Sequence, residues 1–157
     1  METGNVLLIG YGNPGRGDDG LGPAFSEAIS ACGLTSLEVE TDYQLVAEHA
    51  LAVTERDLVV FVDAMMGEEV SFRFGRIVAA RPEALGSHSL RPETVLALAD
   101  TLYGGAPEAW VLGISGYEFG EVREGLSKQA EANLEAAKAF FLSWYRETIL
   151  RPVGAHA

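Results

Sequence analysis

Hydrophobic residues form two alternating patterns along the chain. Short apolar runs, unbroken or alternating with polar residues, are typical of strands, whereas apolar residues at every third or fourth position are typical of amphipathic helices. The expected strands are 6–9, 36–42, 58–62 and 108–116, and the expected helices are 21–33, 43–57, 92–104 and 127–150. This alternation predicts an α/β protein, in which helices cover both faces of a mostly parallel, twisted sheet of about five strands in one three-layer α/β/α domain.

The segment "EVSFRFGRIVAA" departs from this alternation of strands and helices. Val70, Phe72 and Phe74 alternate with polar residues, and Gly75 interrupts the run. Such alternation predicts an antiparallel strand or hairpin at an edge of the sheet. No repeat, linker or low-complexity segment divides the rest of the chain. We therefore expect a single domain over residues 1–150 and a disordered tail over residues 151–157.

The charge balance limits the partners of the protein. The 157 residues include 23 Asp and Glu against 11 Lys and Arg, a formal net charge of −12. Because nucleic-acid binding needs a basic face, and an acidic surface also disfavours anionic membranes, neither partner is expected. No apolar run approaches the roughly 18 residues of a membrane span, and no signal-peptide pattern opens the chain, which predicts a cytoplasmic protein. Cys32 is the single cysteine, and we expect it to be a buried structural thiol.

The stretch "GYGNPGRGDDGLG", which follows the first expected strand, carries the first candidate chemistry. Gly10, Gly12 and Gly15 match the G-x-G-x-x-G fingerprint of dinucleotide-binding folds. That fingerprint needs a helix that opens within the glycine segment, whereas Pro14 delays the helix here to about Leu21. The acidic pair in the same loop would also repel phosphates. Nucleotide binding stays an alternative, because an acidic residue also ends the second expected strand.

The acidic residues favour a cation site instead. Asp19 belongs to the pair Asp18-Asp19 after the first expected strand, and Asp63 ends the third. If the strand order begins 2-1-3, these two strand ends are neighbours at the switch point where ligands bind in such sheets. His88, in the loop "GSHSLRP", is the best third ligand. An oxygen-oxygen-nitrogen set of this kind suits zinc, nickel, iron or manganese.

Each of these residues also has a purely structural interpretation. One acid of the pair would cap the helix that begins near Leu21, Asp63 would cap a turn, and His88 would be a solvated loop residue. The glycines would serve only to pack the first helix against the sheet, rather than to form a tight loop. His49 and His156 are expected to be incidental.

With these residues in view, the chain resembles the hydrogenase maturation proteases, the endopeptidases that process the large subunit of nickel-iron hydrogenases. Four segments carry the resemblance in order: "LLIGYGNPGRGDDGLG", "VVFVDA", "SHSLRPETVLALA" and "VLGISGYEFGEVREGLS". Carried over residue by residue, the metal-binding and catalytic positions of the family fall on Asp19, Asp63 and His88. Some members of the family carry Glu where Asp19 stands, so the side chain here is one methylene shorter.

The resemblance implies a metal-dependent hydrolase that removes a C-terminal extension from a hydrogenase large-subunit precursor after nickel insertion. Nickel would arrive with that substrate, and no nucleotide cofactor is expected. Whether the ion takes part in hydrolysis or serves only in recognition is left open, as is the oligomeric state, for which a monomer is one option. Two alternatives stand beside the protease: a flavodoxin-like or Rossmann-like nucleotide-binding domain, and a maturation chaperone that senses nickel without cutting.

Overall fold

A five-stranded sheet forms the centre of the protein. The computed structural model describes residues 5–67, 69–81, 90–120 and 122–151. The strands are β1 (Val6–Tyr11), β2 (Leu37–Asp42), β3 (Leu58–Met66), β4 (Phe72–Ile77) and β5 (Glu108–Gly116). Their spatial order is β2-β1-β3-β5-β4. The pairs β1–β2, β1–β3 and β3–β5 are parallel, so the expected 2-1-3 order is confirmed.

The edge strand β4 pairs with β5 in the antiparallel direction. It forms one continuous strand through Gly75 rather than a hairpin. Phe74 stacks on Trp110 of β5 and meets Trp144 edge-on, which covers this edge of the sheet with aromatic rings. The expected antiparallel edge strand is therefore confirmed.

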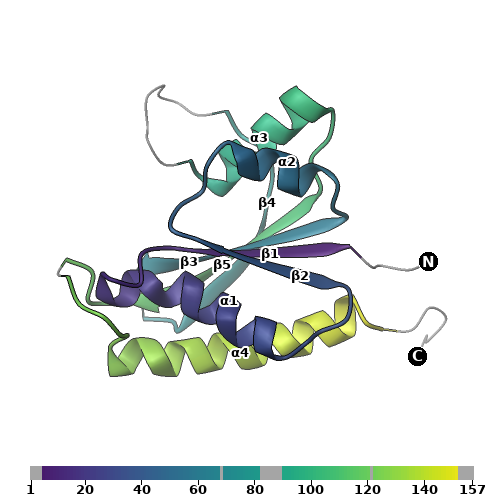
Figure 1. The fold of residues 1–157 in the computed structure, drawn as a ribbon. Helices are drawn as coiled ribbons and strands as arrows, with labels where there is room; N and C mark the ends of the chain where they lie inside the picture. Colours follow the sequence, from purple (N-terminus) through teal and green to yellow (C-terminus); the bar gives the residue numbers. More distant parts are fainter. Residues whose placement is uncertain (1–4, 68, 82–89, 121, 152–157) are drawn as a thin grey trace.

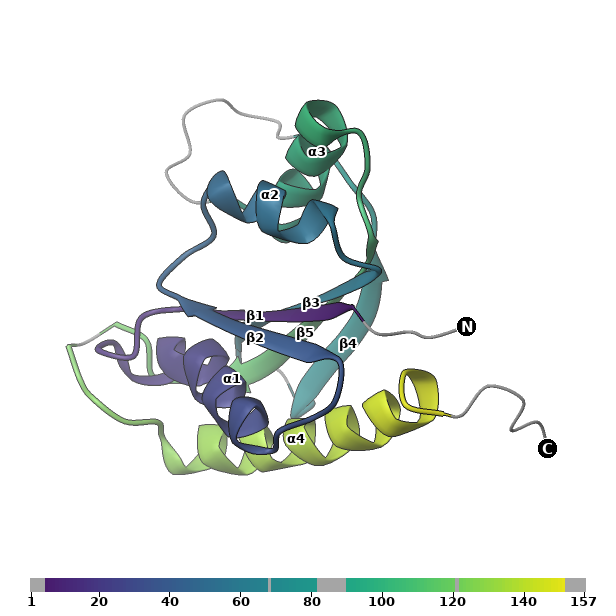
Figure 2. The ribbon, with the colours of Figure 1, turned by 45° about the vertical axis from the view of Figure 1, so that its right-hand side comes forward.

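Helices cover both faces of the sheet in three layers (Figure 1, Figure 2). The helices are α1 (Leu21–Ala31), α2 (Glu48–Thr54), α3 (Pro92–Tyr103) and α4 (Lys128–Thr148). The side chains of Val6 and Leu8 pack with α1 and α4, whereas those of Leu7 and Ile9 pack with α2 and α3. Because successive strand residues point to opposite faces, a strand buried on both faces has the unbroken apolar run that the sequence shows.

Three expectations about individual segments need correction. The second helix covers only Glu48–Thr54, since the residues from Tyr43 onward form the loop that leaves β2 and inserts Leu45 into the core. Strand β3 does not stop at Asp63 but continues to Met66, because β5 extends alongside and supplies backbone partners as far as Gly116. Cys32 is exposed rather than buried, because it lies just beyond the last turn of α1.

No helix in the described part of the chain is both long and apolar enough to cross a membrane.

Candidate active site

The glycine loop between β1 and α1 has a defined conformation. Gly12 adopts a φ of +145°, a backbone region that side-chain-bearing residues rarely enter. The side-chain oxygen of Asn13 accepts a hydrogen bond from the backbone N–H of Gly15 at 2.8 Å. The backbone N–H of Asn13 donates to Oδ2 of Asp19, also at 2.8 Å. The loop therefore holds the partly buried Asp19 carboxylate through its own backbone.

Asp18 has a structural role. Its carboxylate is fully buried and accepts hydrogen bonds from the backbone N–H groups of Tyr117, Glu118 and Ser127 and from the Ser127 hydroxyl, over 2.7–3.0 Å. Burial by itself would raise the pKa of Asp18, but these hydrogen bonds lower it below its ordinary value. Asp18 thus ties the glycine loop to the segment before α4.

Neither acid of the pair caps α1. The residue before this helix is Gly20, and no side chain accepts a hydrogen bond from its first turn. The capping interpretation of Asp18 and Asp19 is therefore wrong. The reason is that both residues lie in a short 3₁₀ turn, Gly17–Gly20, that precedes α1.

Asp63 lies on the face of the sheet that α2 and α3 cover, where β3 runs beyond its last pair with β1. Its Oδ1 accepts a hydrogen bond from the backbone N–H of Ala64 at 2.7 Å, and its carboxylate accepts a second from the Tyr11 hydroxyl. Burial and, to a smaller degree, the nearby Asp19 carboxylate raise the pKa of Asp63, the two hydrogen bonds oppose the rise, and the net pKa is about 6. Asp19, in the loop after β1, therefore lies close enough to Asp63 of the neighbouring strand β3 for its charge to act on that carboxylate.

Tyr11 is a site residue that the sequence analysis missed. Burial, and next the Asp63 carboxylate, raise the pKa of Tyr11 far above its ordinary value, so its hydroxyl stays protonated and donates to Asp63. The signal was present in the sequence, since Tyr11 continues the alternation of Leu7 and Ile9 on one face of β1. A tyrosine hydroxyl at the carboxyl end of a buried strand is the sequence feature that indicates this role.

A cleft of about 580 Å³ contains Asp63 and Tyr11. Its lining also includes Arg73 of β4, Gly113 of β5, and Leu90 and Arg91 at the start of α3. His88 lies outside the described residues, so its predicted role stays a prediction. Among the residues that the structure describes, no three His, Cys, Asp or Glu side chains group together as a metal site would require.

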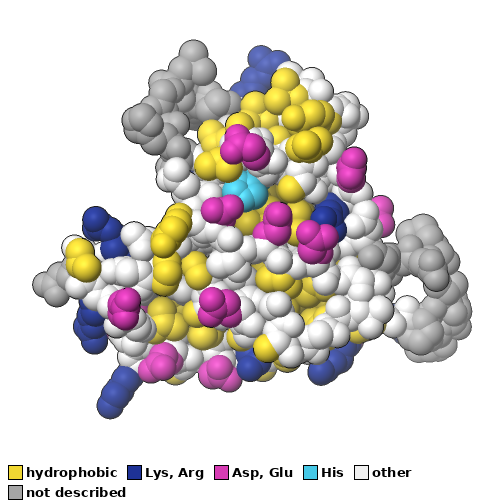
Figure 3. Space-filling view, viewed as in Figure 1, with side chains coloured by type: hydrophobic (Ala, Val, Ile, Leu, Met, Phe, Trp, Pro, Cys, Tyr) yellow, Lys and Arg dark blue, Asp and Glu magenta, His cyan; other side chains and the backbone are white. Residues whose placement is uncertain are grey.

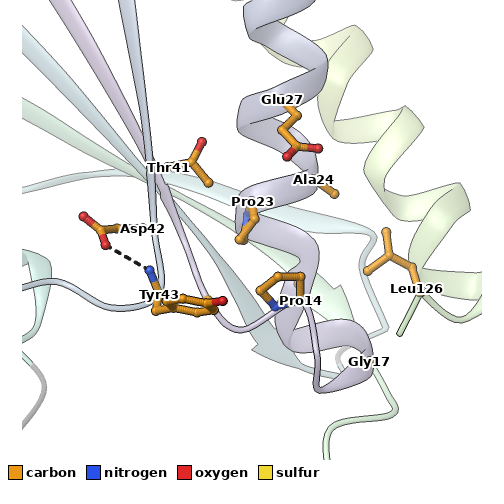
Figure 4. A pocket seen from close by; sticks show the side chains of 12 residues that line it. Pro14, Gly17, Pro23, Ala24, Glu27, Thr41, Asp42, Tyr43 and Leu126 are labelled. Atoms are coloured by element: carbon orange, nitrogen blue, oxygen red, sulfur yellow. Dashed lines mark hydrogen bonds between the residues drawn. The ribbon is translucent and has the colours of Figure 1, made fainter. Parts of the chain in front are cut away.

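The glycine loop lines a second cavity, a groove of about 410 Å³ between the end of β2 and α1 (Figure 4). Gly12, Pro14 and Gly17 contribute from the loop, Thr41 from β2 and Pro23 from α1. The lining does not include Asp19 or Asp63. Gly12 and Gly17 therefore face a cavity different from the one that contains Asp63.

Gly10 supports the interpretation that the glycines pack the first helix against the sheet. A Cβ at this position would lie 2.7 Å from the Cβ of Ser26 in α1, closer than real side chains allow. Gly10 is thus required for the packing of α1 against β1, whereas Gly12 shapes the loop.

His49, expected to be incidental, is buried near the end of β2. Its Nδ1 accepts a hydrogen bond from the backbone N–H of Val46 at 2.9 Å, and its Nε2 lies 3.2 Å from Oδ2 of Asp42. Figure 3 shows a histidine side chain next to acidic side chains on the face in view. Both ring nitrogens are engaged within the fold, so His49 holds the loop after β2 in place.

The arrangement favours an added positive charge. Two carboxylates share one end of the sheet, and the raised pKa of Asp63 shows that its ionised form lacks sufficient compensation. A proton or a metal ion would supply that compensation. Carboxylate oxygens are suitable ligands for divalent metals, so Asp19 and Asp63 have the chemistry of two of the ligands of such an ion.

No protein-family model matches the sequence, and no curated protein matches it. Solved structures do match. The hydrogenase maturation protease HycI from Thermococcus kodakarensis is 22% identical, with 89% of this chain and 91% of that chain covered and a TM-score of 0.70. For the hydrogenase maturating endopeptidase HybD from E. coli, identity is also 22%, with 92% and 93% covered and a TM-score of 0.67.

A third similar structure is the hydrogenase 2 maturation peptidase from Thaumarchaeota archaeon SCGC_AB-539-E09. It is 21% identical, with 88% of this chain and 96% of that chain covered and a TM-score of 0.65. In all three comparisons the match extends over nearly the full length of both chains. This protein therefore has the fold of the hydrogenase maturation proteases.

Proposed function

We propose that the protein is a hydrogenase maturation endopeptidase, which removes the C-terminal extension of a nickel-iron hydrogenase large-subunit precursor. The observation that supports this most is the juxtaposition of Asp19 and Asp63 at the switch point of the sheet, in a chain with the maturation-protease fold. The four sequence segments that resemble the family lie in the same order along the chain. HycI and HybD are a maturation protease and an endopeptidase, respectively.

Nickel in the precursor is the proposed recognition element. We propose that Asp19, Asp63 and His88 bind it, with the two carboxylates supplied by the loop after β1 and by β3. Leu90, two residues after His88, lines the cleft that contains Asp63, which is consistent with a third ligand from this segment. A metal bound there would polarise the scissile carbonyl and lower the pKa of a bound water.

The surrounding residues would prepare these carboxylates for binding. The backbone N–H of Asn13 orients Asp19, and the hydroxyl of Tyr11 orients Asp63. Asp18 fixes the loop itself to the segment before α4. The two carboxylates are thus positioned before the substrate arrives, which limits the entropy lost on binding.

Co-expression with the large-subunit precursor, with and without nickel in the medium, tests the proposal. The intact mass of the precursor reports directly whether the extension is removed. We expect removal with the wild-type protein in the presence of nickel, and retention with Asp63→Asn. If the wild-type protein binds the nickel-loaded precursor but the extension stays on, the protein is a non-cleaving chaperone and the protease proposal is wrong.

Nucleotide binding has less support. Asp18 and Asp19 lie in the turn that leads into α1, where a pyrophosphate would need to approach. A thermal-shift measurement with NAD and with FMN tests this alternative, and we expect no rise in the unfolding temperature with either compound.

A further inference from the structure

The cleft that contains Asp63 has a second wall of opposite charge. Asp63 of β3 pairs in register with Gly113 of β5, and Gly113 pairs in turn with Arg73 of β4. Residues paired in this way point to the same face of a sheet. Asp63 and Arg73 therefore face the same cleft from strands that are separated by β5.

Gly113 leaves the space between these two residues without a side chain from β5. The heavy atoms nearest to a Cβ at Gly113 all belong to Met65, beginning with its Sδ at 3.2 Å. Met65 is a flexible side chain and can yield to a ligand. A peptide segment that lies across the floor between Asp63 and Arg73 would therefore contact Met65 rather than a side chain of β5.

Arginines line the side of the cleft opposite Asp63. Arg73 of β4 and Arg91 at the start of α3 line it, in a chain with 11 Lys and Arg and a net charge of −12. Arg76 also borders the cleft, but it pairs with Trp110 and so lies on the face of the sheet that α4 covers. Glu93 stands near Arg91, at 4.0 Å between Oε1 and the guanidinium Nε. Arg73, exposed at its strand edge, is the cation in the same cross-strand row as Asp63.

We propose that Arg73 is a specificity-determining residue that binds an acidic side chain of the extension while Asp63 acts at the bond to be cut. This inference rests on the proposed endopeptidase function. The proposal is supported by charge complementarity, because an acidic protein repels an acidic peptide overall, whereas Arg73 and Arg91 supply local positive charge in this cleft. A planar guanidinium binds a carboxylate through two parallel hydrogen bonds, which gives it geometric selectivity as well as attraction.

Steady-state processing of purified, nickel-loaded precursor by Arg73→Glu and Arg73→Gln tests the assignment. We expect KM to rise by about tenfold or more for Arg73→Glu, less for Arg73→Gln, and kcat to change little. Arg146→Glu is the matched control, since Arg146 is an exposed arginine in the last turn of α4, in the opposite layer. The unfolding temperature of each variant reports whether the fold is kept.

Charge reversal in the substrate identifies the group that Arg73 binds. Each Asp or Glu of the extension is replaced in turn by Lys, and each variant is offered to wild type and to Arg73→Glu. We expect one of these precursors to be processed poorly by wild type and well by Arg73→Glu.

Three results would overturn the inference while the endopeptidase function still stood. In the first, Arg73→Glu processes the precursor as wild type does. In the second, Arg73→Glu processes the precursor poorly, and no replacement of an Asp or Glu of the extension by Lys restores processing. Arg73 would then support the structure or bind another part of the substrate. In the third, the wild-type protein processes an extension without Asp or Glu as efficiently as the unaltered extension. Failure of the wild-type protein to cut any precursor would instead overturn the endopeptidase function itself.

Discussion

Two carboxylates near the same end of the sheet, the buried Asp18 and the half-buried Asp63, have opposite electrostatic settings. Asp18 accepts four hydrogen bonds and has a lowered pKa. Asp63 accepts one from Ala64 and one from Tyr11, lies beside Asp19, and has a pKa of about 6. In the folded protein the first carboxylate is fully compensated, whereas the second is left with an excess of negative charge.

The difference in pKa distinguishes a carboxylate that stabilises the fold from one that is a candidate for function. A compensated carboxylate contributes to folding, while an uncompensated one costs folding energy unless a proton or metal binds it. Strongly perturbed ionisable groups in clefts are common at functional sites for this reason. The contrast assigns the anchoring role to Asp18 and makes Asp63 the stronger candidate for chemistry.

The largest expected effect is loss of processing when the uncompensated site is altered. Asp63→Asn, Asp19→Asn and His88→Ala should each leave the extension on the precursor, because each removes a proposed nickel ligand. The measurement is the intact mass of the co-expressed precursor. Asp100→Asn, an exposed acid on α3, is the control and should process normally. Full processing by the Asp63 and His88 variants would remove these residues from the site.

Replacement of the compensated acid should act on stability. Asp18→Asn should lower the free energy of unfolding at neutral pH by about 2–4 kcal/mol, because buried donors that bonded to a charged acceptor lose part of their partner. Urea unfolding measures the loss. Since the folded pKa of Asp18 is lowered, its contribution is present above the unfolded pKa near 4 and disappears as the pH falls through the folded pKa.

The two neighbouring acids can be compared directly on activity. When processing is expressed per folded molecule, Asp18→Asn should retain more activity than Asp19→Asn. The reverse order would mean that the anchoring acid, and not Asp19, contributes the ligand.

The same substitution at Asp63 should stabilise the protein. The folded pKa of about 6 lies above the unfolded value near 4, so the favourable contribution of Asp63 is complete below pH 4 and is lost as the pH rises through 6. Asp63→Asn does not titrate, and its gain over wild type should grow across this window to at most about 3 kcal/mol. Urea unfolding of both proteins in the presence of a chelator, at pH 4 and pH 7.5, tests this. The same difference in unfolding free energy between variant and wild type at both pH values would contradict it.

The smallest effect is expected for Tyr11→Phe. Loss of one hydrogen bond to Asp63 removes about 1 kcal/mol of support for its ionised form, which raises the pKa of Asp63. The acid limb of the pH profile of processing should therefore shift to higher pH by less than about one unit. Tyr103→Phe, an exposed tyrosine at the end of α3, is the matched control and should leave the profile unchanged.

Periodicity predicted most of the fold because it reflects burial directly. Strands β1 and β3 are buried on both faces, and their unbroken apolar runs identify them without any knowledge of their neighbours. The second helix was predicted too long because Leu45 is buried from a loop, and an apolar residue in a loop has the same appearance in the sequence as one on a helix.

The candidate site was predicted less completely. Asp19 and Asp63 were selected from their places after strands, and the structure brings them together. The adjacent Asp18 could not be distinguished from Asp19 by sequence spacing, because its partner Ser127 lies 109 positions away. Arg73 was missed because its relation to Asp63 depends on two registers, through Gly113, that local sequence does not encode.

The sequence by itself determined the α/β class, the mostly parallel sheet with one antiparallel edge, and the acidic composition of the chain. These properties follow from local periodicity and from composition, which every segment carries on its own. The tertiary structure alone decided which carboxylate is compensated, which hydroxyl supports Asp63 and which arginine faces it. Those relations depend on distant segments that meet only on folding, since burial and charge around a side chain are set by its spatial neighbours.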